Sequence, residues 1–188
     1  MLFRSHARFD EGRGFCTLNG LAIAATEVVR RGARRVLIVD LDAHGGGGTA
    51  SLIGANSAIE QIDVSVDAFD GYESTRNSRY VLCRGGDYLG TIHQALESVV
   101  DPASIDLVLY NAGVDPHEDC PTGGAIGVTS EVLAQRDRMV FDWARSWSIP
   151  VAFVFAGGYV GARMSRESLV DLHRQTISAA VGSESIDS

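Results

Sequence analysis

The stretch RVLIVDLDAHGGGGT (35–49) decides how this chain folds and where its chemistry lies. Its first half is a short apolar run rich in β-branched residues, and its second half turns abruptly to aspartate, histidine and glycine. Two later runs, IDLVLYNA (105–112) and VAFVFA (151–156), have the same apolar character. Runs of this length and composition are typical of parallel strands that are buried on both faces. We therefore predict that all three are strands of one parallel sheet.

Helix-length segments separate these strands. Segment 19–32 has apolar residues at helical spacing and ends in two arginines and a glycine, which suit a helix C-terminus. Helices are also predicted at 87–100, from a Thr129 cap to about Trp147, and from a Ser165 cap to about Ala180, with a further short strand at 62–66. Alternating strands and helices imply right-handed crossovers and a sheet covered on both faces. The predicted fold is α/β, a three-layer α/β/α arrangement with a mostly parallel sheet.

The composition indicates one ordinary soluble domain. The chain has 188 residues, of which 45% are hydrophobic and 21% are charged, and it shows no internal repeat. Only the C-terminal end is small and polar throughout, so we expect residues 183–188 to form a flexible tail.

Charge and cysteine content narrow the class of partner. The formal net charge is -8 and no block of Lys or Arg occurs, so nucleic acid and anionic membranes would be repelled, whereas a cationic substrate would be attracted. The three cysteines are odd in number and lack the CxxC spacing of metal sites, which fits a reducing compartment. No apolar run approaches the roughly 18 residues that a membrane-spanning helix needs. We expect a cytoplasmic protein without a membrane or nucleic-acid partner.

Four polar side chains follow the three predicted strands. Asp42 and His44 are two residues apart, so in an extended backbone they point the same way and can share one ion. Asp115 follows the second strand and Tyr159 the third, and the carboxyl ends of parallel strands meet at one edge of a sheet. Two carboxylates and an imidazole suit Zn²⁺ or a similar divalent metal, and three protein ligands leave a position open for catalysis.

The same motifs carry a resemblance that covers about Ser5 to Ala180. The chain resembles the histone deacetylase superfamily, most of all the class IV deacetylases and their bacterial relatives. The matching stretches are HARFDEGRGFCTLNGLAIAA (6–25), VLIVDLDAHGGGGT (36–49), LVLYNAGVD (107–115), GVTSEVLAQRD (127–137) and IPVAFVFAGGY (149–159). The resemblance implies an arginase/deacetylase fold and hydrolysis of an acylated amine, either an acyl-lysine or an acetylpolyamine. It also implies that residues 1–182 are a deacetylase-like domain that lacks the family's N-terminal part.

Roles for individual residues follow from the resemblance. It makes Asp42, His44 and Asp115 the ligands of one zinc ion per chain. It makes His6 the general base and then acid, a task that suits imidazole because its ordinary pKa is near neutrality. It makes Tyr159 the hydrogen-bond donor to the developing oxyanion.

A second group of residues is implied to support this site. Gly157 and Gly158 would let the tyrosine loop approach the metal closely. The carboxylate of Asp40 resembles part of the family's monovalent-cation site, which would hold K⁺. The other expected ligands of that cation are the backbone carbonyls of Asp42, His44, Ser65 and Val66.

The chain departs from the family pattern at several positions. Ser5 stands where the family has its first histidine, so a basic side chain is replaced by a shorter hydroxyl. Gly46 and Gly47 fall where relatives more often carry a polar side chain, and we therefore expect His6 to lack its usual orienting partner. Asp67 replaces a histidine of many relatives, and we interpret it as a solvated loop residue.

Two other functions stay open on the sequence. A manganese-dependent ureohydrolase shares the implied fold, and SVDAFD (65–70) is faintly similar to its aspartate-rich loop. A catalytically impaired metal-binding fragment or interaction module would keep the ligands without turnover, in line with Ser5. Lack of the family's front portion would leave a sheet edge bare, and edges invite pairing, so either a homo-oligomer or a truncated gene product is expected.

Overall fold

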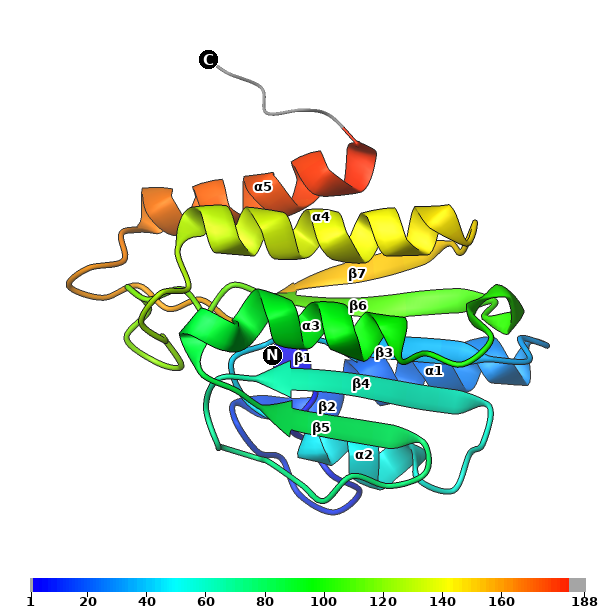
Figure 1. The fold of residues 1–188 in the computed structure, drawn as a ribbon. Helices are drawn as coiled ribbons and strands as arrows, with labels where there is room; N and C mark the ends of the chain where they lie inside the picture. The colour runs from blue at the N-terminus through cyan, green and yellow to red at the C-terminus, as the bar shows by residue number, and fades with distance from the viewer. Residues whose placement is uncertain (1, 183–188) are drawn as a thin grey trace.

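The computed structural model describes residues 2–182 and contains a five-stranded sheet in which every strand pair is parallel. The strand order is β5-β4-β3-β6-β7 (Figure 1). The strands are β3 (Val36–Asp40), β4 (Ile59–Ser65), β5 (Ser78–Leu82), β6 (Leu107–Gly113) and β7 (Val151–Ala156). The chain runs outward from β3 through β4 to β5 and then returns to the other side of β3. The order therefore reverses between β3 and β6, and such a switch point is where open α/β sheets bind ligands.

Helices cover both faces of this sheet (Figure 1). They are α1 (Gly20–Arg30), α2 (Gly47–Ile53), α3 (Tyr88–Glu97), α4 (Ser130–Ser146) and α5 (Arg166–Val181). Helices α3 and α4 lie on one face, α1 and α2 lie on the other, and α5 packs beside α4 (Figure 1). Short 3₁₀ turns occur at Gly85–Asp87 and Pro102–Ser104. The predicted three-layer α/β/α fold and its mostly parallel sheet are thus confirmed.

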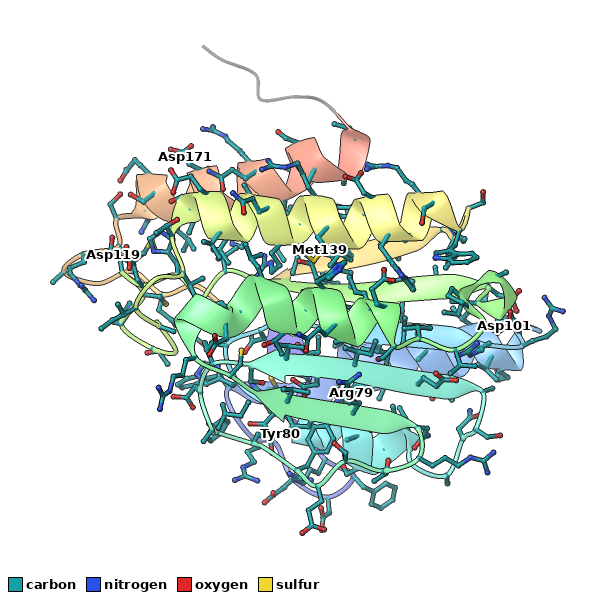
Figure 2. The ribbon with its side chains drawn as sticks, in the orientation of Figure 1. Arg79, Tyr80, Asp101, Asp119, Met139 and Asp171 are labelled. Carbon is teal, nitrogen blue, oxygen red and sulfur yellow. The ribbon has the colours of Figure 1, made fainter. Side chains whose placement is uncertain are left out.

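Alternation along β3 divides the core between the two layers. Leu37 and Val39 face the larger cluster, which includes side chains of α3, α4 and α5, whereas Ile38 faces a smaller cluster formed with α1. Met139 lies between α4 and the sheet and packs against the larger cluster (Figure 2). Because β3 is buried on both sides, its sequence is a continuous apolar run rather than an alternating one.

The glycine-rich run after His44 is not the flexible loop that its composition suggests. Helix α2 begins at Gly47, and its first three residues are buried. A Cβ atom on Gly48 would lie 2.4 Å from the backbone of His6, so the glycine allows the helix to pack directly against that segment. A glycine-rich composition usually indicates a flexible backbone. Here the missing side chain of Gly48 instead lets α2 pack closely against the segment of His6.

The sheet has two open edges. Strands β5 and β7 each have only one neighbour in the described part of the chain, and Val154 and Phe155 of β7 are 44% and 49% exposed. A separate parallel ribbon pairs β1 (Leu2–Arg4) with β2 (Cys16–Asn19), and neither strand was predicted. The expected flexible tail at 183–188 lies outside the described residues. Across residues 2–182, no helix is long and apolar enough to cross a membrane.

Asn19 joins β2, α1 and the segment that carries His6. Its Oδ1 atom accepts from the backbone N–H of Ala22 at 2.9 Å and caps α1. Its Nδ2 atom donates to the carbonyls of Ser5 and Ala7 at 2.9 and 3.1 Å, and the whole residue is only 3% exposed. One side chain therefore fixes both the start of a helix and the position of residues 5–7.

We predict that Asn19→Ala lowers the free energy of unfolding by about 3 kcal/mol, because it removes a helix cap and takes one hydrogen-bond donor from each of the buried carbonyls of Ser5 and Ala7. Urea denaturation would measure this loss. The matched control is Ser165→Ala, which removes only the exposed cap of α5 and should cost about 1 kcal/mol. Equal losses in the two variants would contradict the additional role of Asn19.

Candidate metal and acid-base site

A row of buried polar side chains crosses the sheet at the switch point. The strand register pairs Asp63 of β4 with Asp40 of β3, and Asp40 with Asn111 of β6. All three are fully buried. The amide of Asn111 donates to Asp40 Oδ1 at 2.6 Å. The carboxyl end of the apolar strand β3 is therefore polar, and the loops that follow β3 and β6 start beside this row.

The three predicted metal ligands come together just beyond the row. His44 Nδ1 lies 2.9 Å from Asp42 Oδ1 and 3.4 Å from Asp115 Oδ2. Asp115 also accepts from the backbone N–H of Ala43 at 3.0 Å, which ties the loop after β6 to the loop after β3. Asp42 and Asp115 are fully buried, and His44 is 8% exposed.

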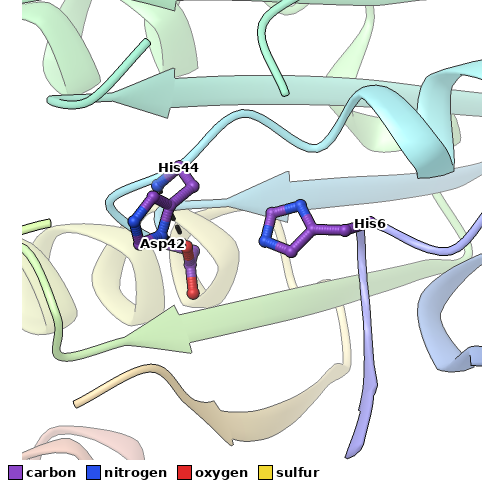
Figure 3. A group of neighbouring side chains, drawn as sticks. All are labelled: His6, Asp42 and His44. Carbon is purple, nitrogen blue, oxygen red and sulfur yellow. Dashed lines mark hydrogen bonds and ion pairs between the residues drawn. The ribbon is translucent and has the colours of Figure 1, made fainter. Parts of the chain in front are cut away.

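His6 approaches the same point from the end of β1 (Figure 3). Metal-binding atoms of His6, Asp42 and His44 all lie within 4.8 Å of one another. His6 reaches the site because Gly14 and Gly48 make room for it. A Cβ on Gly14 would lie 2.4 Å from its ring, and one on Gly48 would meet its backbone.

Burial and the charges of neighbouring groups shift the pKa values of Asp42, His44 and Asp115. Burial and the charge of Asp42 raise the pKa of Asp115 to about 6. Burial would lower the pKa of His44, but its hydrogen bonds to Asp115 and Asp42 outweigh this and raise the pKa to about 10. Burial likewise raises the pKa of Asp42, and the contact with His44 more than reverses the effect, so that pKa is lowered. The metal-free site therefore holds a proton on His44 between two carboxylates.

This donor set fits a divalent ion such as zinc. A neutral imidazole and two carboxylates are zinc ligands, and the ion would replace the proton that His44 shares with them. Its charge would balance both carboxylates, whose burial is otherwise costly. Three protein ligands leave further positions of the ion open.

His6 has an orienting partner, Asp70, that was not predicted from the sequence. Its Nδ1 atom lies 3.2 Å from Asp70 Oδ2. Arg8 donates to the other oxygen of Asp70 at 2.6 Å, and the backbone N–H of Gly48 donates to Oδ2 at 3.1 Å. A carboxylate can only accept, so Nδ1 carries the proton and Nε2 is left as the basic nitrogen.

The expectation that His6 lacks a partner is therefore wrong. A Cβ on Gly47 would lie 2.5 Å from the backbone oxygen and 3.0 Å from Oδ1 of Asp70, so Asp70 occupies the space that a side chain at position 47 would fill. Asp70 has a φ of 53°, a left-handed conformation in which aspartate and asparagine are enriched. The sequence feature that could have indicated this contact is the combination of a glycine at position 47 and an aspartate at position 70.

Tyr159 lies on the same cavity as the two histidines. The cavity has a volume of about 400 Å³ and its wall includes His6, His44, Phe15, Phe69, Asp67, Pro121 and Tyr159. The ring centroids of Phe15 and Tyr159 are 6.4 Å apart. Asp67, interpreted above as a solvated loop residue, is half-buried and forms part of this wall.

The glycines before Tyr159 are required by close packing and by backbone conformation. Gly157 and Gly158 have φ angles of 59° and 87°. A Cβ on Gly157 would lie within 2.2 Å of the carboxyl carbon of Asp115. The tyrosine loop therefore passes directly over a predicted metal ligand, as expected from the sequence.

A comparison with protein families agrees with this arrangement. The model of the histone deacetylase domain matches residues 4–66 and 70–171, which include all of the side chains described above for this site except Asp67 and Phe69. The chain belongs to the histone deacetylase family.

Individual relatives show how much of the family this chain spans. It is 36% identical over 159 residues to an uncharacterized protein of Picosynechococcus sp., covering 82% of this chain and 53% of that one. It is 30% identical over 181 residues to histone deacetylase 2 of Arabidopsis thaliana, covering 90% and 46%. The solved acetylpolyamine aminohydrolase of Burkholderia pseudomallei has the same fold, with a TM-score of 0.76 and 22% identity over 94% of this chain and 53% of that one. The chain thus spans about half the length of these relatives.

The position expected to bind a monovalent cation in this histone deacetylase domain has a suitable oxygen. Asp40 Oδ2 is buried, and none of residues 2–182 provides it with a hydrogen bond. Burial and the charge of Asp42 raise the pKa of Asp40 to about 7. Asp63, which was not predicted, adds a second buried carboxyl whose pKa is also raised by burial and by the charge of Asp40. The available signal was an aspartate between Ile62 and Val64 in a predicted strand.

Ser5, the departure from the family's first histidine, is fully buried. Its hydroxyl oxygen has no hydrogen-bond partner within the described range, and the residue is absent from the cavity wall. Its carbonyl, in contrast, accepts from Thr49 N at 2.8 Å. The backbone of Ser5 helps to position His6, and its side chain has no comparable contact.

We predict that Asp70→Asn lowers the pKa of His6 in the metal-free protein. Burial alone lowers this pKa, and the hydrogen bond to Asp70, with the charges of Asp42 and Asp40, raises it above its ordinary value of 6.5. The substitution removes both the hydrogen bond to a carboxylate and a negative charge. Burial, which lowers the pKa of His6, is then opposed by fewer interactions. Histidine NMR titration would measure the change.

Asparagine tolerates the left-handed backbone at position 70, so the fold should persist. Glu11→Gln is the matched control, because Glu11 contacts Arg8 from an exposed position. An unchanged His6 pKa in Asp70→Asn would show that Asp70 does not orient the imidazole.

Proposed function

We propose that this chain hydrolyses the amide bond of an acylated amine, an acyl-lysine or an acetylpolyamine, with zinc held by Asp42, His44 and Asp115. One observation carries the proposal: His6 presents its free Nε2 beside this ligand set, with Nδ1 fixed on Asp70. Membership of the histone deacetylase family supports the same reaction class. The net charge of -8 favours a cationic substrate of either kind.

The residues divide the reaction between them. Zinc, when bound, supplies Lewis-acid chemistry, which polarises a carbonyl and makes water more acidic. His6 Nε2 accepts the proton of the attacking water, and Asp70 stabilises the imidazolium that results. His6 then returns this proton to the leaving nitrogen, so that the products are a free amine and a carboxylate.

Tyr159 acts on the carbonyl oxygen. Its hydroxyl is placed on the wall of the cavity that also contains His6, and it would donate a hydrogen bond as negative charge develops on that oxygen. Phe15 and Phe69 supply apolar walls beside the tyrosine. Asp40 would hold K⁺ behind the ligands, and this cation would offset part of the negative charge there.

A metal-binding module without turnover is the second candidate. The buried Ser5 hydroxyl favours it, because a serine cannot supply the cationic donor that a histidine would. The ureohydrolase alternative is less well supported. Its metal loop needs a carboxylate where Gly46 stands, and Asp70 of the aspartate-rich segment contacts His6 rather than His44.

We predict that zinc uptake releases a proton from His44. The pKa of about 10 means that the metal-free imidazole is protonated at pH 7, and it must lose that proton to bind an ion. Apparent zinc affinity should therefore rise with pH, by up to about tenfold per unit below that pKa. Calorimetric titrations in buffers of different ionisation enthalpy would count the released protons. A binding enthalpy independent of the buffer would contradict the assignment.

The function itself is tested by amine release from acyl-lysine peptides and acetylpolyamines. We expect release by the zinc-loaded chain that a chelator abolishes. Tyr159→Phe should lower the rate about a hundredfold or more, because it removes one donor to the oxyanion.

Tyr72→Phe is the matched control, since Tyr72 is a half-buried tyrosine that stacks on Tyr80 outside the cavity wall. A folded, zinc-bearing chain that released no amine from any substrate would refute the hydrolase and leave the binding module.

A further inference from the structure

Arg136 of α4 is the largest side chain that is fully buried in the described structure. Its Nε atom donates to Asp137 Oδ1 at 2.9 Å, and its Nη2 atom lies 2.7 Å from the same oxygen. Its Nη1 atom donates to the carbonyl of Gly113 and, at 3.4 Å, to the carbonyl of Leu41. A buried guanidinium is costly unless hydrogen bonds and a neighbouring negative charge compensate for its burial.

The two carbonyls belong to the two metal loops. Leu41 directly precedes the predicted zinc ligand Asp42, and Gly113 stands two residues before Asp115. They come from neighbouring strands, β3 and β6, on either side of the switch point. One guanidinium therefore bridges both loops from behind, on the face opposite the row that contains Asp40 and Asn111.

The arginine is itself held in place by a buried network. The carboxylate of Asp137 accepts from Tyr110 of β6 at 2.5 Å and from Thr176 of α5 at 2.6 Å. Tyr88 of α3 donates to the carbonyl of Leu41 at 2.9 Å, beside the arginine. Three helices thus converge on the backs of the two loops.

We propose that Arg136 is a positioning residue for the metal centre, which sets the separation of Asp42 and Asp115 by clamping the carbonyls of Leu41 and Gly113. The loops are in contact, since a Cβ on Gly113 would lie 2.5 Å from the Cα of Asp42, and a small shift of one loop would change the distance between the two carboxylates. Partners outside the ligand set commonly alter metal affinity in this way. This inference rests on the proposed function, because it takes Asp42 and Asp115 as zinc ligands.

The test is zinc affinity, measured by competition with a fluorescent chelator, together with the visible spectrum of the cobalt-substituted protein. Arg136→Met should weaken zinc binding by about tenfold or more and change the cobalt spectrum. Arg136→Lys keeps the charge but cannot span both carbonyls and Asp137, so an intermediate loss is expected. Neither readout depends on hydrolysis.

Val140→Ala is the matched control, because Val140 is fully buried in the core on the same helix and its side chain cannot hydrogen-bond to the loops. It should lose stability in urea while binding zinc as tightly as the wild type. If Arg136→Met fails to fold, Arg136→Lys decides the matter. Wild-type affinity in the arginine variants, or an equal loss in Val140→Ala, would overturn the positioning role. A wild-type chain that binds no zinc would instead refute the proposed function.

Discussion

The burial of several carboxylates at one end of a parallel sheet is the constraint on which the rest of this structure depends. Asp40, Asp42, Asp63 and Asp115 are all fully buried within a small region around β3. An ionised carboxylate in such surroundings costs several kcal/mol unless it is paired. Compensation comes from backbone N–H groups, from His44 and from amide side chains, and in the proposed enzyme from bound cations. The close approach of the metal loops and the buried charge on α4 follow from the same requirement, because each loop must keep its carboxylate within reach of these partners.

Much of the fold could be predicted because its signals are local. Strand β3 is a continuous apolar run, and the caps of α4 and α5 are a threonine and a serine that each accept from the backbone N–H three positions later. The convergence of Asp42, His44 and Asp115 was also predictable, since the carboxyl ends of parallel strands meet at one edge. What the sequence could not show was the order of the strands. Only that order places the loops after β3 and β6 on either side of the switch point.

The features that were missed or wrongly predicted depend on long-range packing that overrides local preference. Four consecutive glycines disfavour a helix by about 1 kcal/mol each, yet α2 begins among them because the segment of His6 lies against it. Asp70 is 64 residues from His6 in the chain, and SVDAFD contains a second aspartate, Asp67. Which aspartate faces the imidazole depends on a left-handed backbone at position 70 and on the absence of a side chain at Gly47. The glycine is visible in the sequence, but the left-handed backbone at position 70 and the approach of Asp70 to that glycine are not.

Protons and metal compete for the same buried charges, and this competition links the stability of the fold to its chemistry. The raised pKa of Asp115, about 6, means that the folded metal-free chain binds more protons than the unfolded chain between about pH 4 and 6. The raised pKa of His44 extends this excess from 6.5 to about 10. Both groups therefore contribute stability that is lost as the pH rises through these ranges. A divalent ion reverses the sign, because it binds the deprotonated forms and stabilises only the folded chain. The buried groups that hold protons in the metal-free chain are thus the same groups that bind the metal more tightly as the pH rises.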